Sequence, residues 1–407
     1  MKIGLLTYHA ACNFGANLQV LSTVEYFRNA GHDIYVIDWY SEELEMFYRN
    51  STPEKQYLCH VEYRQKYLPL TNRCFNEIDV ARTIEELGIE AVVVGSDAVA
   101  QHHPLKSRRK FAPRLLKFTV YEPTKDRMFP NCFWGSFIDH LKTPIPIAMM
   151  SGSSQNSDYK LMTMKEKEAM KESVKRFSYI STRDSWTSDM IKYITDGAII
   201  PTVTPDPVFA FNYNVKTQPT KDEILKKYKL PDHYFLVSFH NSNTVSQEWL
   251  GKLKSKSSIK GRECVAMAFP QGMEFKHPFD YAINIPLSPM DWYCLIKYSD
   301  GYIGHNMHPI VVCLHNAVPC YSFDNYGVVK MRYFVNDKSS KIYHILSIFE
   351  LLGYRSRSVG KRIDVPTVDY VLERIANFNK KGVSIVSNAY LYKYKTMMSD
   401  VLNSIKR

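Results

Sequence analysis

Short apolar runs alternate with stretches of helical periodicity from the first residues of this chain onward. Residues 3–7 form an apolar run, residues 18–27 place an apolar side chain at every third or fourth position, and residues 34–39 form a second apolar run. Gly31 marks the end of the helical stretch. A strand, a helix and a strand in this order predict a parallel sheet with helices on its faces.

The same alternation continues as far as residue 203. Further strands are predicted at residues 91–94, 145–150, 179–182 and 199–203, and helices at residues 165–177 and 185–195. Residues 41–85 are polar, rich in tyrosine and weakly periodic, which indicates an insertion. We interpret residues 1–215 as one Rossmann-like domain that carries this insertion.

A polar segment at residues 213–232 marks the predicted domain boundary. Beyond it, strands are predicted at 235–239, 264–268, 301–304 and 319–322, and helices at 247–256, 292–298 and 309–316, from 342 and from 368. Residues 230–407 are therefore interpreted as a second Rossmann-like domain with C-terminal helices. Two such domains in sequence predict an α/β protein of GT-B-like architecture, in which the domains face a cleft.

The composition is typical of a soluble globular protein. Of the 407 residues, 45% are hydrophobic and 23% are charged, which allows a substantial core. None of the eight cysteines forms a CxxC pair and no zinc-ligand spacing occurs, so we expect reduced thiols, no metal ion and a cytoplasmic protein. The start of the chain is interpreted as a strand and not a signal peptide, and no apolar stretch approaches the roughly 20 residues that span a bilayer.

The formal net charge of +11 favours anionic partners without choosing among nucleic acids, acidic lipids and phosphorylated substrates. No recognised nucleic-acid-binding module organises this charge, so we predict no nucleic-acid partner. In the densest basic run, residues 106–117, lysines and arginines interleave with Phe111, Leu115 and Leu116. Such a run is typical of a solvated face, and it would also suit a helix lying on the anionic inner surface of a membrane.

Polar side chains gather where the predicted parallel strands end, and ligands bind at that edge of such sheets. The loop after the first strand holds Asn13, Gly15 and Asn17. Gly15 permits a tight turn there, and the helix that follows could direct backbone N–H groups at an anion. Ser96 and Asp97 end the strand at 91–94, and Asp97 is interpreted either as a base or hydroxyl ligand or as a helix N-cap.

Three further strand ends carry candidate chemistry. Ser153 belongs to a loop of small residues that would let a phosphate or sugar approach closely, or that only forms a tight turn. Arg183 suits bidentate binding of phosphate or carboxylate, with a surface salt bridge as the alternative. His308 stands before Pro309 at a predicted helix N-terminus, where it could bind a phosphate oxygen, transfer a proton or serve the structure alone.

Taken in order, these segments resemble the polysaccharide pyruvyltransferase family. The matching stretches are GLLTYH at 4–9, NFGANLQ at 13–19, VGSD at 94–97, STRD at 181–184, PDP at 205–207, MHPI at 307–310 and NAVP at 316–319. The resemblance covers about residues 3–330 and rests on the order of the motifs more than on any single one. It implies transfer of an enolpyruvate-derived group from phosphoenolpyruvate to a sugar, with formation of a cyclic pyruvate ketal.

The resemblance also implies roles for individual residues. Arg183 and His308 would hold or activate the donor, and we assign Ser153, Asn306 and Lys330 to the donor side with them. Asn306 departs from the family, which has an arginine there, so a neutral amide stands where a cation would meet phosphate. We expect no cofactor beside the phosphoenolpyruvate substrate.

Acid and base chemistry is needed because the donor CH2 must gain a proton and two sugar hydroxyls must lose theirs. We assign His308 as the acid or phosphate ligand and Asp97 as a candidate base. Lys330 or Arg332 is a candidate substitute for the missing arginine. The acceptor side is assigned to four residues of the first domain: Asn13, Gly15, Asn17 and Ser96. Asp97 is followed by Ala98-Val99-Ala100, where the family has Gln and, further on, Trp.

The predicted function is therefore ketal pyruvyltransfer to a hexose, such as galactose, of a lipid-linked or polymeric glycan. The product would belong to a cell-surface polysaccharide, such as an exopolysaccharide or a capsule. One alternative is a glycosyltransferase or other transferase with a nucleotide-sugar donor, which Asn306 motivates. A second alternative is a non-catalytic relative that binds a glycan or phosphate without turnover.

Overall fold

The first half of the chain folds into a seven-stranded parallel sheet. The computed structural model describes residues 1–112, 117–155, 157–330, 334–359 and 362–406. The first sheet has the strand order β3-β2-β1-β4-β7-β8-β9. Its strands are β1 (Lys2–Leu6), β2 (Asp33–Trp39), β3 (Leu70–Cys74), β4 (Ala91–Asp97), β7 (Ile147–Gly152), β8 (Tyr179–Thr182) and β9 (Thr202–Val203). The central strands are buried on both faces, as their unbroken apolar runs predicted.

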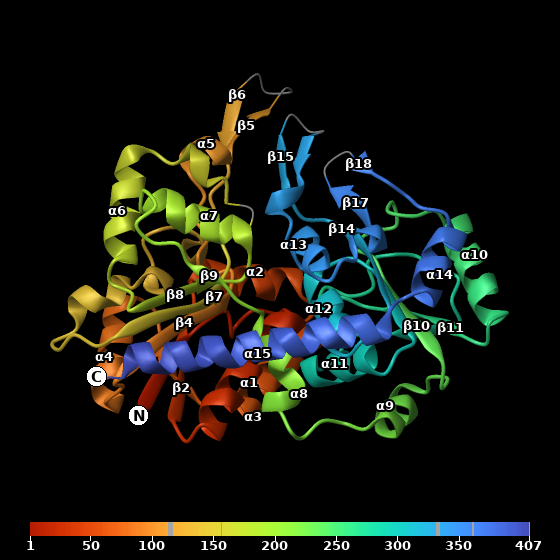
Figure 1. Ribbon diagram of the computed structural model, residues 1–407, viewed down its shortest axis with the longest axis horizontal. Helices are drawn as coiled ribbons and strands as arrows, with labels where there is room; N and C mark the ends of the chain where they lie inside the picture. The colour runs from red at the N-terminus through yellow and green to blue at the C-terminus, as the bar shows by residue number, and fades with distance from the viewer. Residues whose placement is uncertain (113–116, 156, 331–333, 360–361, 407) are drawn as a thin grey trace.

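The second half repeats this plan. The second sheet has the strand order β12-β11-β10-β13-β14-β17-β18 and is parallel apart from its last strand. Its strands are β10 (Tyr234–Ser238), β11 (Glu263–Met267), β12 (Tyr281–Ile283), β13 (Gly301–Gly304), β14 (Cys320–Asp324), β17 (Arg355–Val359) and β18 (Arg362–Ile363). The predicted α/β class with two Rossmann-like sheets is confirmed, and Figure 1 shows the two units side by side.

Helices cover both sheets close to the predicted positions. In the first unit they are α1 (Phe14–Asn29), α2 (Glu42–Ser51), α3 (Glu54–Tyr67), α4 (Glu77–Leu87), α6 (Met164–Val174) and α7 (Ser185–Ile194). In the second they are α10 (Gln247–Ser258), α11 (Pro289–Lys297), α12 (Met307–His315), α13 (Lys341–Ile348) and α14 (Val368–Ala376). Helix α1 is buried over most of its length because it packs against α11 of the other unit as well as against its own sheet.

The last helix, α15 (Lys380–Ile405), joins the two units. The sequence predicts that the C-terminal helices belong to the second domain, but α15 runs across both halves of the molecule (Figure 1). It contacts α12 in the second unit and β7, β8 and β4 in the first. One buried stripe, which includes Tyr390, Tyr394 and Met398, continues along its length and supplies apolar contacts to both units.

Two expectations from the sequence differ from the structure. The predicted insertion at 41–85 is regular structure: β3 pairs with β2 at the sheet edge, and α2, α3 and α4 flank it. Its weak periodicity follows from the partial exposure of an edge strand. The membrane-surface helix considered as an alternative for residues 106–117 is not seen in the described part of that run, where α5 (Leu105–Arg108) is helical and β5 (Arg109–Ala112) pairs antiparallel with β6 (Lys117–Val120). The sequence of β6 alternates polar and apolar residues with a period of two, which favours a strand; residues 113–116, with Leu115 and Leu116, lie outside the described residues.

Two further predictions from the sequence concern the cysteines and membrane-spanning helices. All eight cysteines are free, and every one except Cys59 is buried. Within the described ranges, no helix has the length and apolar character needed to cross a membrane.

Candidate active site

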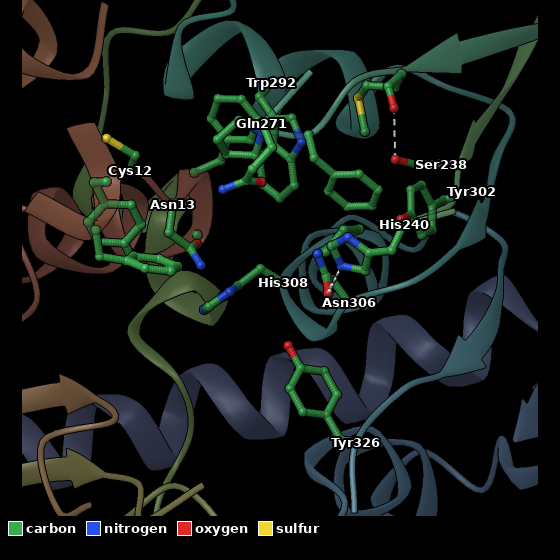
Figure 2. Close-up of a pocket in the computed structure, with 18 residues that line it drawn as sticks. Cys12, Asn13, Ser238, His240, Gln271, Trp292, Tyr302, Asn306, His308 and Tyr326 are labelled. Carbon is green, nitrogen blue, oxygen red and sulfur yellow. Dashed lines mark hydrogen bonds between the residues drawn. The ribbon is translucent and has the colours of Figure 1, made fainter. Parts of the chain in front are cut away.

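A cavity of about 240 Å³ lies between the two units, at the carboxyl ends of their strands (Figure 2). The first unit contributes Cys12, Asn13, Phe14, Gly15, Phe47 and Tyr48. The second unit contributes Ser238, His240, Met267, Phe269, Pro270, Gln271, Trp292, Tyr302, Asn306, His308, Pro309 and Tyr326. None of these lining residues is a lysine, arginine, aspartate or glutamate. The predicted cleft is therefore present, and its wall is polar and aromatic without a formal charge other than that of histidine.

Two helix N-termini from different units meet at this cavity. Helix α1 begins at Phe14 with Asn13 as its N-cap, and α12 begins at Met307. The imidazole of His308 lies directly over the backbone of Gly15, so that a Cβ atom added at Gly15 would overlap the ring. Gly15 therefore has a steric function at the domain interface, and both helix starts, each with a partial positive charge, border the same cavity.

A buried cluster of charges lies directly behind His308. The Arg183 guanidinium donates from Nη1 to Asp206 Oδ2 at 2.9 Å and from Nη2 to Asp97 Oδ1 at 3.2 Å. The Nε2 atom of His308 lies 3.7 Å from the same Asp206 Oδ2, which also accepts a hydrogen bond from Gln19 at 2.5 Å. The strand ends thus bring Asp97, Arg183 and His308 together as predicted, although Arg183 does not line the cavity and both of its terminal nitrogens are paired.

The cluster sets the protonation states of its members. Burial alone would raise the pKa of Asp97, but the charges of Arg183, His308 and Lys341 outweigh burial and the pKa is lowered. Burial lowers the pKa of His308, and the carboxylates of Asp206 and Asp97 offset only part of that effect. At neutral pH the site therefore holds an ionised Asp97 and a neutral His308 whose side chain is 12% exposed.

Lys341, the first residue of α13, is a member of this cluster that the sequence did not reveal. Its side chain is buried and its ammonium lies 4.8 Å from the ring centroid of Tyr326. Among the described residues it forms no ion pair with a carboxylate. Burial and, after it, the charge of Arg183 lower the pKa of Lys341 to about 8. Of the predicted substitutes for the missing arginine, Lys330 is the last residue of the hairpin strand β15 (Val328–Lys330), and Arg332 lies outside the described residues.

The buried charge of Lys341 gives a pH-dependent stability. Because its pKa is about 8 in the folded chain against 10.5 in a free lysine, charging it costs about 3 kcal/mol at most. Between these values the unfolded chain holds a proton that the folded chain has lost, so wild-type stability rises with pH across that window. We expect Lys341→Met to raise the free energy of unfolding at pH 7 and this gain to shrink as the pH rises through the window.

Urea unfolding of wild type and Lys341→Met at pH 7 and near pH 10 measures this difference. The other titrating groups are common to both proteins and cancel in the comparison. A gain that does not change with pH, or a variant less stable than wild type at pH 7, contradicts an unpaired buried charge at Lys341.

Asn306 occupies a strained position on the cavity wall. It follows β13 at the start of α12, and its backbone has φ 76° and ψ 152°, a conformation that residues other than glycine rarely adopt. Its Oδ1 lies 2.9 Å from His240 Nε2 and 3.4 Å from Asn325 Nδ2. The neutral amide is therefore fixed by His240, a cavity residue that we did not single out from the sequence.

The remaining predicted residues divide between the wall and the interior. Asn13 lines the cavity and accepts the Ala16 N–H as N-cap of α1. Asn17, Ser96 and Ser153 are buried away from the cavity lining. Asn17 hydrogen-bonds the His9 carbonyl, and the Ser153 hydroxyl donates to the capping carboxylate of α7. Direct ligand contact by these three residues stays a prediction, while their observed contacts hold the fold.

Aromatic side chains make up much of the wall. Phe14 and Trp292, from the two different units, stack at 5.3 Å with an interplanar angle of 24°. Phe47 and Tyr48, on α2, reach the cavity from the segment that the sequence suggested was an insertion. Aromatic rings of this kind pack on the C–H faces of sugars. The sequence alone does not show that these aromatic residues, which are far apart along the chain, meet at one cavity.

Comparison with known proteins agrees with this geometry. The family model for polysaccharide pyruvyl transferase matches residues 13–326. A search of curated proteins finds no match. The solved UDP-GlcNAc 2-epimerase of Neisseria meningitidis, bound to UDP-GlcNAc, has a TM-score of 0.52 at 10% identity over 99% of this chain and 100% of its own. The UDP-N-acetylglucosamine 2-epimerase of Rickettsia bellii has a TM-score of 0.50 at 11% identity over 100% of this chain and 97% of its own.

At such low identity these solved structures show the fold alone, and they confirm the predicted GT-B-like architecture. The family match covers most of the chain and includes Asp97, Arg183 and His308, the three residues that the strand ends bring together. The chain is therefore a transferase that belongs to the polysaccharide pyruvyl transferase family.

Proposed function

We propose that this chain transfers the enolpyruvyl group of phosphoenolpyruvate to a hexose of a lipid-linked or polymeric glycan and closes it to a cyclic ketal, on the cytoplasmic side. The observation that carries the proposal is His308, which lies in an interdomain cavity with the buried Asp97–Arg183–Asp206 cluster behind it. This arrangement supplies a proton carrier next to fixed charges, in a chain of the matching family.

The positive potential that would attract the anionic donor comes from two helix N-termini, since the described residues that line the cavity include no lysine or arginine. The N-termini of α1 and α12 point at one cavity, and each carries a partial positive charge. Lys341 and Arg183 lie behind the wall, with Arg183 largely offset by its two carboxylates. Backbone N–H groups at the two helix starts therefore favour the phosphate and carboxylate of the donor.

The proposed reaction assigns His308 a change of charge. It is neutral in the empty site, and a bound phosphate dianion favours the imidazolium again. The imidazolium then protonates the donor CH2 and regains a proton from the first sugar hydroxyl, which attacks C2. Phosphate leaves as a second hydroxyl closes the ring, and the proton of that hydroxyl ends on the phosphate. Asp97, ionised and paired with Arg183, stabilises the charged His308 from behind rather than accepting a proton from the sugar. No step needs a metal ion.

The aromatic wall supports a glycan acceptor. Trp292, Phe14, Phe47, Tyr48 and Tyr326 border the same space as His308. Apolar ring faces with few polar groups bind the C–H faces of a hexose and leave its hydroxyls directed at the acid–base residues.

A nucleotide-sugar transferase is the second candidate function. It is favoured by the absence of lysine and arginine from the cavity lining and by Asn306, whose amide is neutral. In that case a nucleoside diphosphate sugar, and not phosphoenolpyruvate, would occupy the cavity.

A donor screen tests the two functions against each other. Purified protein is incubated with phosphoenolpyruvate or with nucleotide sugars, together with lipid-linked oligosaccharides, and the products are read by mass spectrometry. The proposal predicts a gain of pyruvyl mass with release of phosphate. A gain of hexose mass from a nucleotide sugar, with phosphoenolpyruvate inert, contradicts it and supports the second candidate; binding without any product indicates a non-catalytic relative.

Gly15 gives a steric test of the His308 position. Since a methyl group at Gly15 would overlap the His308 ring, Gly15→Ala must displace the imidazole. We expect phosphate release from phosphoenolpyruvate to fall about 100-fold, because a displacement near 1 Å disrupts proton transfer. Gly251→Ala is the matched control, since an added Cβ there meets nothing within 4 Å. Equal activity of Gly15→Ala and the control would show that the ring position does not matter for turnover.

A further inference from the structure

His240 is a second histidine in the cavity wall, and contacts with neighbouring side chains fix the position of its ring. It follows β10 of the second unit, and its ring stacks on Phe269 at 4.0 Å and on His305 at 5.4 Å. Its Nδ1 lies 2.9 Å from Glu274 Oε2 and its Nε2 lies 2.9 Å from Asn306 Oδ1. The side chain is 33% exposed and borders the cavity, and Figure 2 shows it in contact with Asn306 at the start of the helix that carries His308.

Both ring nitrogens of His240 face oxygen acceptors. A neutral imidazole donates from one nitrogen only, whereas an imidazolium donates from both. The Asn306 oxygen is turned toward the ring, an orientation that its contact with Asn325 Nδ2 supports. The contacts to Glu274 and Asn306 are therefore satisfied together when both ring nitrogens donate, in a wall whose described residues include no lysine or arginine.

Each of the two cavity histidines has a carboxylate beside one ring nitrogen. Asp206 lies 3.7 Å from His308, and Glu274 lies 2.9 Å from His240. The reaction proposed above moves two protons from the sugar: one ends on the donor carbon, which becomes a methyl group, and the other ends on an oxygen of the departing phosphate. This transfer is balanced without an outside acid or oxidant, and it needs two proton carriers.

We propose that His240 is the second acid–base residue of this site, which binds the donor phosphate as an imidazolium and protonates it as it leaves. The proposal rests on the proposed function. A phosphate oxygen takes over the Nε2–H from Asn306 Oδ1, and the freed amide of Asn306 turns its own N–H toward the same phosphate. The second sugar hydroxyl then returns a proton to His240 as the ketal closes.

Two titratable groups face the His240 ring. The Glu274 carboxylate contacts Nδ1 directly and favours a positive charge on the ring. His305 stacks on the ring, and burial, together with the charge of His240, lowers the pKa of His305 to about 3, so it stays neutral. Loss of the Glu274 charge should therefore weaken the binding of the donor phosphate to the His240 ring.

Three variants test the proposal. His240→Gln should lower kcat with phosphoenolpyruvate about 100-fold while the protein stays folded. Glu274→Gln keeps an oxygen acceptor for Nδ1 but removes the charge, so it should raise the KM for phosphoenolpyruvate about tenfold while the protein stays folded, a result that a purely structural contact would not produce. His233→Gln is the matched control, because His233 pairs with Asp300 at 3.1 Å, is largely exposed and lies at the opposite end of β10. The activity of this variant should stay within about twofold of that of wild type.

The outcomes separate the two proposals. If wild type releases phosphate from phosphoenolpyruvate but His240→Gln matches the His233→Gln control, the role of His240 is overturned and the function stands. A KM for phosphoenolpyruvate in Glu274→Gln equal to that of wild type overturns it too, even where His240→Gln fails to fold. If wild type releases no phosphate with any acceptor, the proposed function fails and the role of His240 fails with it.

Discussion

Replacing His308 by alanine is expected to lower turnover with phosphoenolpyruvate by about 100-fold to 10,000-fold, the range of a lost general acid. The ring reaches into the cavity and its Nε2 faces Asp206, so no other group of the described wall stands in the same place. The fold should persist, because the side chain packs on the Gly15 backbone rather than in an apolar core. His308→Gln should keep donor binding but little turnover, since an amide can hydrogen-bond and cannot transfer the proton.

Phosphate release and thermal unfolding, measured side by side, decide this prediction. The expected result is inactive protein with an unfolding transition close to that of wild type. Full activity in His308→Ala would eliminate His308 from the chemistry, and a large loss of stability would assign it a structural function instead.

Loss of the Arg183 guanidinium is expected to have the largest effect on stability. Arg183 is buried between Asp97 and Asp206, and Arg183→Met would leave two carboxylates without their cation. Breaking a buried ion pair from one side costs about 3–5 kcal/mol, because the remaining charge is desolvated and unpaired. Arg183→Lys should lower the free energy of unfolding by less, because it keeps the positive charge. It still loses some stability, because lysine lacks the planar guanidinium that bonds both carboxylates.

Urea unfolding at neutral pH measures the loss. Arg82→Met is the control, because Arg82 pairs with Asp79 on the surface of α4 and such pairs contribute about 1 kcal/mol or less. If Arg183→Met costs no more than this control, the charge cluster does not hold the two strand ends together, and a direct role of Arg183 in donor binding becomes the better account.

The strand ends mark the site because parallel sheets bring the carboxyl ends of their strands to one edge. Asp97, Arg183 and His308 are far apart in sequence, yet each lies at or just after the end of a strand, and the structure places them in one cluster. His240 also follows a predicted strand, so the same rule applied to it would have found it. Its contacts with Glu274 and Asn306 depend on loop conformations that periodicity does not encode.

Other features were beyond the sequence pattern for physical reasons. Lys341 starts a helix far from the motifs, and only its burial beside Tyr326 distinguishes it from the other lysines. The pairing of β5 with β6 cannot be distinguished from a helix in the sequence, because mixed charged and apolar residues satisfy both periods over a short window. Helix α15 could be predicted as a helix, but its return to the first sheet is a tertiary contact.

The proposed reaction is pyruvyl transfer in which a proton is delivered to the donor carbon. The most direct test is incubation of the purified chain with phosphoenolpyruvate and a lipid-linked hexose acceptor in D2O, with mass spectrometry of the glycan and assay of free phosphate. The account predicts a pyruvyl ketal whose methyl group carries a single deuterium, formed in step with released phosphate. A glycan that gains no pyruvyl mass while phosphoenolpyruvate stays intact would contradict it.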